Sequence, residues 1–324
     1  MQFKSVKGFT GWAQIGILCV YLGAGLILTS IVQILILGML DPSAVSSGDP
    51  KQITDIILKP ENVGYARLIQ VLGTFFLMFL PAVFWSLTVN GKNPLWLGFS
   101  KYVSAKQIAV GFALIFIAGL LASPLAEISK SIVANFPDLN RLAKQMEDAY
   151  NQQVIALSNL QNIGELLMAI IIMAFLPALF EEMLFRGVIQ NLLTKWWKSA
   201  IPAIIVTAII FSIIHMSVYL FASRILLGVV LGLMFFYTKN IWVNVIAHFL
   251  NNFLAVLQLY YNSSKAKPVA VEDLDPSVPW WLAIAAAAGL IFLFKYLIKI
   301  SQHNRSVIIV KEEAMPYINP YQKI

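Results

Sequence analysis

The chain has 324 residues, of which 59% are hydrophobic and only 12% charged, and its formal net charge is +7. This composition is too apolar for an ordinary soluble domain and indicates an integral membrane protein. The basic residues lie singly between apolar runs, so the net charge does not indicate nucleic-acid binding. With a single cysteine, Cys19, the sequence has no disulfide framework and no cysteine-based metal site.

Long apolar runs recur along the chain, and each can cross about 30 Å of hydrocarbon as a helix. Membrane barrels need alternating segments of about ten residues, which are not seen here. We therefore predict an all-α, polytopic helix bundle that forms one integral membrane domain over residues 1–324. The eight predicted spans are 11–40, 68–89, 107–126, a span from about 163 into the Glu181-Glu182 pair, 202–221, 225–238, 242–261 and 280–299.

The placement of lysine and arginine predicts the orientation of these spans, because cytoplasmic loops are enriched in both. We predict a multi-pass protein of the cell membrane with both termini in the cytoplasm, including a short tail at 301–324. The loop at 265–275 is placed on the other side. The residues assigned to the cytoplasm are Lys4, Lys7, Lys92, Lys101, Lys106, Lys195, Lys198, Lys239, Lys299, Arg305, Lys311 and Lys323.

The segments outside the spans leave no room for a soluble domain, because the longest has only about 35 residues. This segment, at about 127–162, carries apolar residues at helical spacing. It is either a helix lying along the membrane surface or a short solvated helix that joins two spans. Gly228 and Gly232 form a Gly-x-x-x-Gly pair, which predicts close helix packing. Any activity must lie within or beside the membrane.

Ionisable residues inside the predicted spans are concentrated in the second half of the chain. A charged residue at membrane depth costs about 2.5–3.5 kcal/mol on insertion scales, so such a set indicates a functional site. The third histidine, His303, lies in a polar tail instead. The residues of the set are Glu181, Glu182, Arg186, His215 and His248.

Helical spacing predicts how the two carboxylates differ. Glu182 and Arg186 are four residues apart and face each other, so an ion pair would lower the cost of burying both. Glu181 points about 100° away, which leaves its carboxylate available to a cavity as a general base. The simpler alternative is an interfacial charge cluster at a helix end.

The two histidines inside apolar runs each have a partner one helical turn away. Phe211 precedes His215 on the same helix face. His248 and Asn252 can direct two hydrogen-bond donors to one point, as stabilisation of an oxyanion requires. The alternatives are ordinary packing for His215 and interhelical hydrogen bonding for His248 and Asn252, and the neighbouring Asn251 is a further structural candidate.

Three motifs on successive helices resemble the CPBP family of intramembrane proteases. This family includes the CAAX prenyl endopeptidases and the bacteriocin-processing and abortive-infection-type membrane proteins. Each motif alone is a weak indicator of the family. The three in this order, over roughly residues 165–260, form a strong signature of it. The motifs are Glu181-Glu182-x-x-x-Arg186, Phe211-x-x-x-His215 and His248-x-x-x-Asn252.

The resemblance implies an intramembrane endopeptidase whose motif-bearing catalytic core covers residues 163–261. Glu181 and His215 would activate a water, and His248 and Asn252 would form the oxyanion site. The implied substrate is a peptide or a membrane-protein segment, cut near the membrane surface in contact with the lipid bilayer. The residues that would support the first two motifs are Glu182, Arg186 and Phe211.

The sequence leaves the cofactor and two other classes of function open. A metal-dependent version would use Glu181, His215 and His248 as three ligands with water as the fourth, which matches catalytic zinc. A proton- or ion-coupled transporter would use the same buried Glu, His and Arg side chains, and an inactive membrane scaffold is a further alternative. A transporter is expected to have two similar halves, so the confinement of these residues to one half favours the enzyme.

Overall fold

A computed structural model describes residues 3–157, 160, 162–264 and 278–315 of the chain. The described residues form helices, and the β-pairing among them is limited to one isolated bridge between Lys4 and Thr10. The predicted all-α helix bundle is therefore confirmed. The predicted loop at 265–275 and the end of the predicted tail, 316–324, lie outside the described residues.

Seven helices in the described part of the chain are long and apolar enough to cross a membrane, so the predicted number of eight is approximately right. The remaining predicted span corresponds to α11 (Ala200–Ile214), whose 15 residues extend about 22 Å. The seven are α1 (Gly11–Leu40), Pro60–Val89, α6 (Ala105–Ala134), Ile163–Trp197, α12 (Phe221–Thr238), Ile241–Tyr261 within α13 (Ile241–Ser264), and α14 (Trp280–Glu313).

The predicted boundary between the fifth and sixth spans, 202–221 and 225–238, is wrong. The first of these helices ends at Ile214, and the second begins at Phe221, giving α12 a length of 18 residues. Met216 has a left-handed backbone with a φ of 50°, and a residue in this conformation ends a helix. The apolar side chains continue through this turn, so hydropathy did not mark it.

Two of the long spans are composite helices that contain π-helical turns. Pro81 and Pro177 each lie in the first turn of the α-helix that follows a π-helical turn. Proline has no backbone N–H, so it cannot donate the regular α-helical hydrogen bond to the preceding turn. The first composite contains η1 (Pro60–Asn62), α4 (Val63–Thr74), η2 (Phe75–Phe79) and α5 (Leu80–Val89). The second contains α8 (Ile163–Ala169), η4 (Ile170–Phe175), α9 (Leu176–Glu182), η5 (Met183–Gln190) and α10 (Asn191–Trp197).

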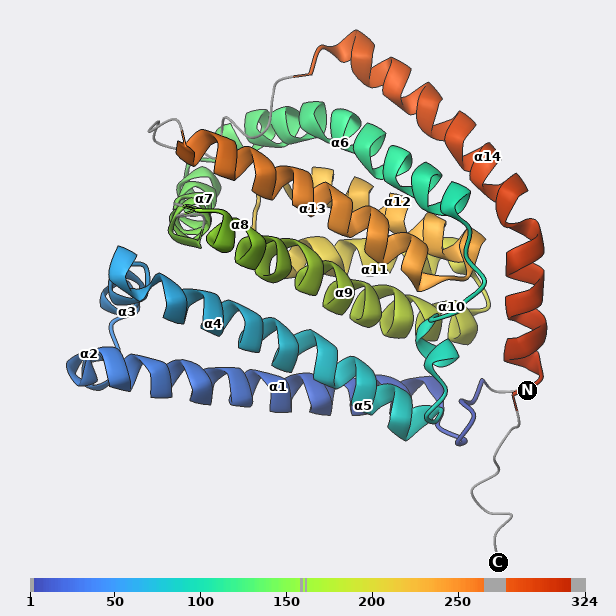
Figure 1. Ribbon diagram of the computed structural model, residues 1–324, viewed down its shortest axis with the longest axis horizontal. Helices are drawn as coiled ribbons and strands as arrows, with labels where there is room; N and C mark the ends of the chain where they lie inside the picture. The colour runs from blue at the N-terminus through green and yellow to red at the C-terminus, as the bar shows by residue number, and fades with distance from the viewer. Residues whose placement is uncertain (1–2, 158–159, 161, 265–277, 316–324) are drawn as a thin grey trace, which may run out of the picture.

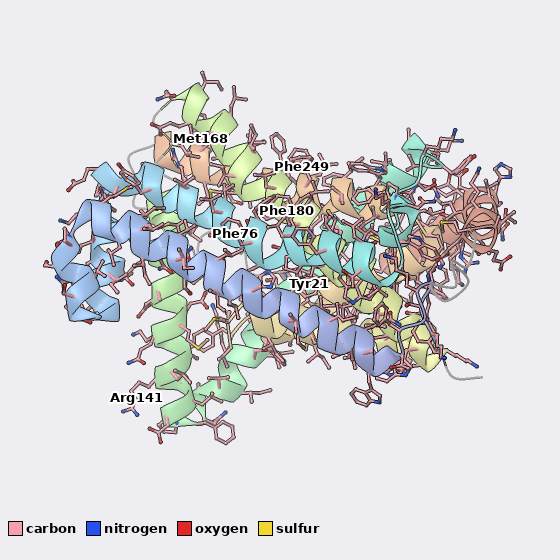
Figure 2. All side chains as sticks on the ribbon, turned by 90° about the horizontal axis from the view of Figure 1, so that it is seen from below. Tyr21, Phe76, Arg141, Met168, Phe180 and Phe249 are labelled. Carbon is pink, nitrogen blue, oxygen red and sulfur yellow. The ribbon has the colours of Figure 1, made fainter. Side chains whose placement is uncertain are left out.

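The connections include one long helix, α7 (Pro137–Leu157), in the segment at 127–162 whose structure the sequence left open. Figure 2 shows the hairpin of α6 and α7 projecting from the bundle, with Arg141 near its tip. The other end of α7 packs on the bundle, where Arg67 of α4 donates to the Leu157 carbonyl at 3.2 Å. The shorter connecting helices are α2 (Pro42–Ser47), α3 (Pro50–Ile57) and η3 (Pro94–Leu97).

The helices of the second half pack around α6, which contacts α12, α13 and α14. The pair formed by α1 and the α4–α5 helix lies along one side of this group (Figure 1). Gln107 of α6 donates to Ser301 Oγ of α14 at 2.9 Å, and the helix of α14 continues to Glu313. The first part of the predicted tail, 301–313, is therefore helical.

The Gly228-x-x-x-Gly232 pair allows α12 to approach α11 closely. A Cβ atom on Gly228 would lie 3.0 Å from the Ala208 Cα atom, and one on Gly232 would lie 2.7 Å from Ile204 Cγ2. The Gly228 Cβ would also lie 2.9 Å from the Ala208 Cβ atom, a separation that real Cβ atoms essentially never show, so glycine at 228 permits the observed separation of these helices. The predicted packing role of the pair is confirmed.

We predict that Gly228→Ala destabilises the protein, because the added methyl group forces α11 and α12 apart. Overpacking of this kind costs about 1–3 kcal/mol, and thermal unfolding in detergent should show a lower Tm. Gly119→Ala is the matched control, since no atom lies within 4 Å of a Cβ at that position of α6. Equal Tm values for the two variants would contradict the close-packing role.

Candidate active site

The Glu182 carboxylate lies at the centre of a completely buried polar group. Arg186 Nη1 donates to its Oε1 at 2.8 Å, which is the ion pair predicted from helical spacing. His248 Nδ1 lies 3.0 Å from the same oxygen, and Asn244 Nδ2 donates to Oε2 at 3.1 Å. Glu182 and Arg186 are both 0% exposed, so these contacts replace the water that each charge has lost.

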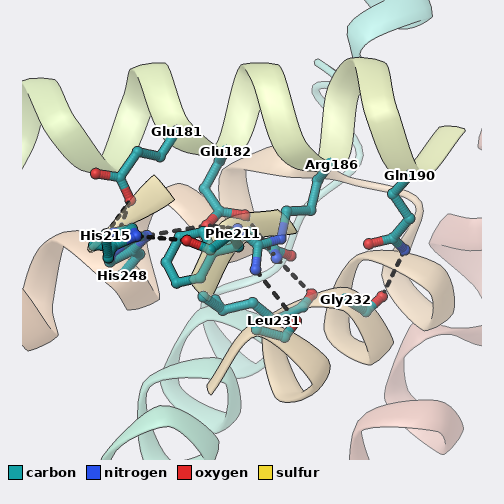
Figure 3. Close-up of polar contacts among 11 residues, drawn as sticks. Glu181, Glu182, Arg186, Gln190, Phe211, His215, Leu231, Gly232 and His248 are labelled. Atoms are coloured by element: carbon teal, nitrogen blue, oxygen red, sulfur yellow. Dashed lines mark hydrogen bonds and ion pairs between the residues drawn. The ribbon is translucent and has the colours of Figure 1, made fainter. Parts of the chain in front are cut away.

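Arg186 and Gln190 extend this group along the same helix (Figure 3). Arg186 Nη2 donates to the Gly228 carbonyl at 3.2 Å, and its guanidinium lies 5.1 Å from the centre of the Phe211 ring. Gln190 Nε2 donates to the Gly232 carbonyl at 2.8 Å. The two glycines that let α12 approach α11 therefore also present carbonyls to the polar side chains of η5.

Sequence reasoning missed two members of this group, Asn244 and Gln190. Each lies one helical turn from a residue that was predicted, since Asn244 precedes His248 by four positions and Gln190 follows Arg186 by four. Carboxamides at this spacing within the apolar runs are the sequence signal that indicates both.

His215 is held at the end of α11 by two contacts with its own chain. Its Nδ1 lies 2.7 Å from the Phe211 carbonyl, and the two rings are 4.3 Å apart between centres. Arg224 of α12 donates to the His215 carbonyl at 2.9 Å. Because a carbonyl can only accept, Nδ1 carries a proton in this contact, and in the neutral form of the ring Nε2 is therefore unprotonated.

Glu181 faces a different environment from its neighbour. Its Oε2 lies 3.9 Å from His215 Nε2 and 3.9 Å from His248 Nε2, which is too long for a direct hydrogen bond. This oxygen is buried and has no hydrogen-bond partner among the described residues. Adjacent carboxylates on one helix thus differ: one is paired in the interior, and the other faces the two histidines (Figure 3).

A cavity of about 430 Å³ begins at Glu181 and the two histidines. Asn251 and Asn252 both line it, one turn beyond His248 on α13. The structure therefore brings the predicted pair of His248 and Asn252 to one cavity, with His248 Nδ1 already engaged by a carboxylate. Both carboxamides are half-buried and face the same space.

Comparison with known protein families gives one match, and the matched segment contains the residues of this site. The family model for the type II CAAX prenyl endopeptidase Rce1-like family matches residues 163–254. These residues form an Rce1-like domain. The predicted resemblance is confirmed over the segment that contains all three motifs, and the match to this domain family implies a membrane protease of the CAAX type. Comparisons with curated proteins and with solved structures found no match.

The side chains of the Rce1-like domain do not form a metal site in this conformation. No group of three or more His, Cys, Asp or Glu side chains in the described part of the chain has the arrangement that holds a metal ion. In the set predicted from the sequence, Glu181 Oε2 lies 3.9 Å from Nε2 of His215 and of His248, farther than two ligands of a tetrahedral zinc ion that each lie about 2.0–2.2 Å from the metal. We therefore derive no catalytic step through a metal.

We predict that Arg186→Met reduces the amount of folded Rce1-like domain, because it leaves Glu182 buried without its guanidinium. Breaking one side of a buried pair costs about 3–5 kcal/mol, and Glu182→Gln should show a loss of the same kind. The measurements are the yield of monodisperse protein in detergent and its Tm. Arg141→Met is the control, because it breaks the exposed pair with Asp138. Normal amounts of folded, inactive protein in both Arg186 and Glu182 variants would indicate a direct chemical role instead.

Proposed function

We propose that the chain is an intramembrane endopeptidase in which Glu181 and His215 activate a water molecule, and His248 and Asn252 stabilise the oxyanion. The observation that carries this proposal is the position of Glu181 Oε2, 3.9 Å from the Nε2 atoms of both histidines at the inner end of the cavity. Each of these 3.9 Å gaps can be bridged by a water oxygen at an ordinary hydrogen-bond distance from both atoms. The buried Oε2 requires such a partner.

The hydrogen bonds made by Nδ1 of each imidazole support different proposed roles for the two histidines. His215 donates from Nδ1 to a backbone carbonyl, so Nε2 of the neutral ring can accept a hydrogen bond from the attacking water. His248 donates from Nδ1 to the Glu182 carboxylate, and in our proposal this ring is protonated on both nitrogens. His248 Nε2 then carries the proton that an oxyanion donor needs.

With a neutral His215 and a doubly protonated His248, the charges of the buried Glu, Arg and His side chains sum to zero. Glu181 and Glu182 contribute two negative charges, while Arg186 and a protonated His248 contribute two positive charges. A balanced group avoids the large cost of a net charge in a low-dielectric interior. This balance supports a neutral His215 and a cationic His248 as the resting state.

Peptide hydrolysis then proceeds by attack of the water oxygen on the carbonyl carbon of the scissile bond. One water proton passes to the Glu181 carboxylate, while the other is hydrogen-bonded to His215 Nε2. The carbonyl electron pair moves to the oxygen, where His248 Nε2–H and the Asn252 carboxamide stabilise the negative charge. When the tetrahedral intermediate collapses, the C–N bond breaks and the proton from Glu181 passes to the departing amine.

A transporter requires a path that can open towards either side of the membrane. On the side of Glu181 nearer to α10, the space is filled by Glu182, Arg186 and Gln190, which are at most 2% exposed. These residues are tied to α12 and α13 by hydrogen bonds, so the described structure favours a site that is closed at one end. This arrangement suits a hydrolase better than a carrier.

We predict that Glu181→Gln abolishes peptide cleavage and leaves folding unchanged, because the amide cannot accept the water proton. The measurement is cleavage of a peptide library by detergent-purified protein, with and without a chelator. Glu127→Gln, an exposed change on α6, is the matched control and should retain full activity. Turnover by Glu181→Gln above a few per cent of wild type would reject Glu181 as the base. Loss of wild-type activity with chelator, and its recovery with zinc, would reject the metal-free step.

We predict that Asn252→Ala lowers kcat by roughly a hundred- to a thousandfold and leaves KM nearly unchanged. An oxyanion donor acts most strongly in the transition state, and removal of one donor costs about 2.7–4 kcal/mol there. Single-turnover kinetics with a cleaved peptide measure this effect, and Asn135→Ala, at the exposed end of α6, is the control. If Asn252→Ala weakens substrate binding and spares the single-turnover rate, the residue belongs to a binding surface instead.

A further inference from the structure

The two ends of the helix bundle differ in charge. We use "basic face" for the end that holds the N-terminus, α10 and the end of α14 in Figure 1. Its loops and helix ends carry many basic side chains, and the acidic residues described there are Glu312 and Glu313. The basic residues of this face are Lys4, Lys7, Lys92, Lys101, Lys106, Lys195, Lys198, Lys239, Lys299, Arg305 and Lys311.

The opposite end, the "mixed face", holds α2, α3 and α7 (Figure 1). Its described bases are matched by at least as many acids, so it lacks a cationic bias. They are Lys51, Lys59, Lys130, Arg141 and Lys144, with Asp41, Asp49, Asp55, Glu61, Glu127, Asp138, Glu147 and Asp148. Lys and Arg enrichment marks cytoplasmic loops, so this difference orients the basic face towards the cytoplasm.

The cavity extends from the active site towards the mixed face. Its lining follows α13 from His248 through Asn252 and Val256 to Leu259, over a rise of about 16 Å away from the basic face. Tyr150, Gln153 and Val154 of α7 and Gln70 of α4 complete its outer part. Gln153 is exposed and donates to Gln70 Oε1 at 3.3 Å, so polar groups lie at the outer end.

The same site is closed towards the basic face. Glu182, Arg186 and Gln190 follow Glu181 along the helix towards α10, and all three are buried. Their hydrogen bonds to the Gly228 and Gly232 carbonyls join this helix to α12. A peptide approaching from the basic face would have to displace a buried ion pair, whereas towards the mixed face the cavity lining reaches the exposed Gln153.

We propose that the active site receives its substrate from the mixed face, on the side of the membrane away from the cytoplasm. The substrate class is an exported peptide or the non-cytoplasmic end of a membrane-spanning segment, and this assignment of substrate rests on the proposed protease function. The lining suits apolar side chains and peptide groups, because it combines Leu157, Leu227 and Leu259 with the carboxamides of Gln70 and Asn251.

Cysteine labelling in intact bacterial cells tests the direction of access without requiring activity. Cys19→Ala removes the native thiol, and single cysteines are then placed at Gln153, on the cavity rim, and at exposed Lys198, on the basic face. With a membrane-impermeant maleimide, Gln153→Cys should be labelled in intact cells and Lys198→Cys only after permeabilisation. The reverse pattern, or labelling of both from one side, would overturn the proposal. Arg141→Cys and Lys101→Cys repeat the comparison at exposed positions if either first variant fails to fold.

Cleavage in oriented vesicles tests the same proposal through the reaction. A peptide cleaved by the detergent-purified protein is added outside right-side-out or inverted membrane vesicles. Cleavage in right-side-out vesicles and its loss in inverted ones is expected, and the opposite pattern overturns the direction of access. If no peptide is cleaved even in detergent, the protease proposal fails while the labelling result still decides the direction. Adding Glu181→Gln to the labelling variants should change cleavage and leave the labelling pattern unchanged.

Discussion

The buried Glu182 carboxylate is the constraint on which the rest of the structure depends. It accepts hydrogen bonds from Arg186 on its own helix and from Asn244 and His248 on α13. Arg186 in turn binds the Gly228 carbonyl of α12, so three helices are held in register by one charge. A carboxylate in the interior is tolerated only while these partners stay in place, because its alternative is an unpaired buried charge. The close approach of α12 at Gly228 serves this requirement.

The same constraint separates two adjacent carboxylates into different environments. Glu182 is fully engaged, whereas Glu181 Oε2 has no hydrogen-bond partner among the described residues and faces His215 and His248. In the mechanism we propose, one carboxylate orients and charges an imidazole while the other accepts a proton from water. This division requires neighbouring side chains that face different surroundings, which a helix provides because consecutive side chains point about 100° apart.

The buried network also relates catalysis to access. Because Glu182, Arg186 and Gln190 fill the space on the side of α10, the cavity that starts at Glu181 extends in one direction only, towards α7 and the outer end of α13. The turn that carries His215 is tied to α7 as well, since Ser217 Oγ donates to Glu147 at 3.0 Å. Helix α7, which lines the outer part of the cavity, therefore contacts the turn that follows His215.

The sequence by itself determined the membrane-spanning class, the helical architecture and the Glu182–Arg186 pair, because hydropathy and i,i+4 spacing are local properties of the chain. The match of residues 163–254 to the Rce1-like family model also agrees with motifs that are short and local. Only the tertiary structure decided that His248 Nδ1 binds Glu182, that Asn244 shares the carboxylate and that α11 stops at Ile214. The two hydrogen bonds join residues more than 60 positions apart, and the early end of α11 comes from a backbone turn within a run that stays apolar. Local periodicity carries no information about either.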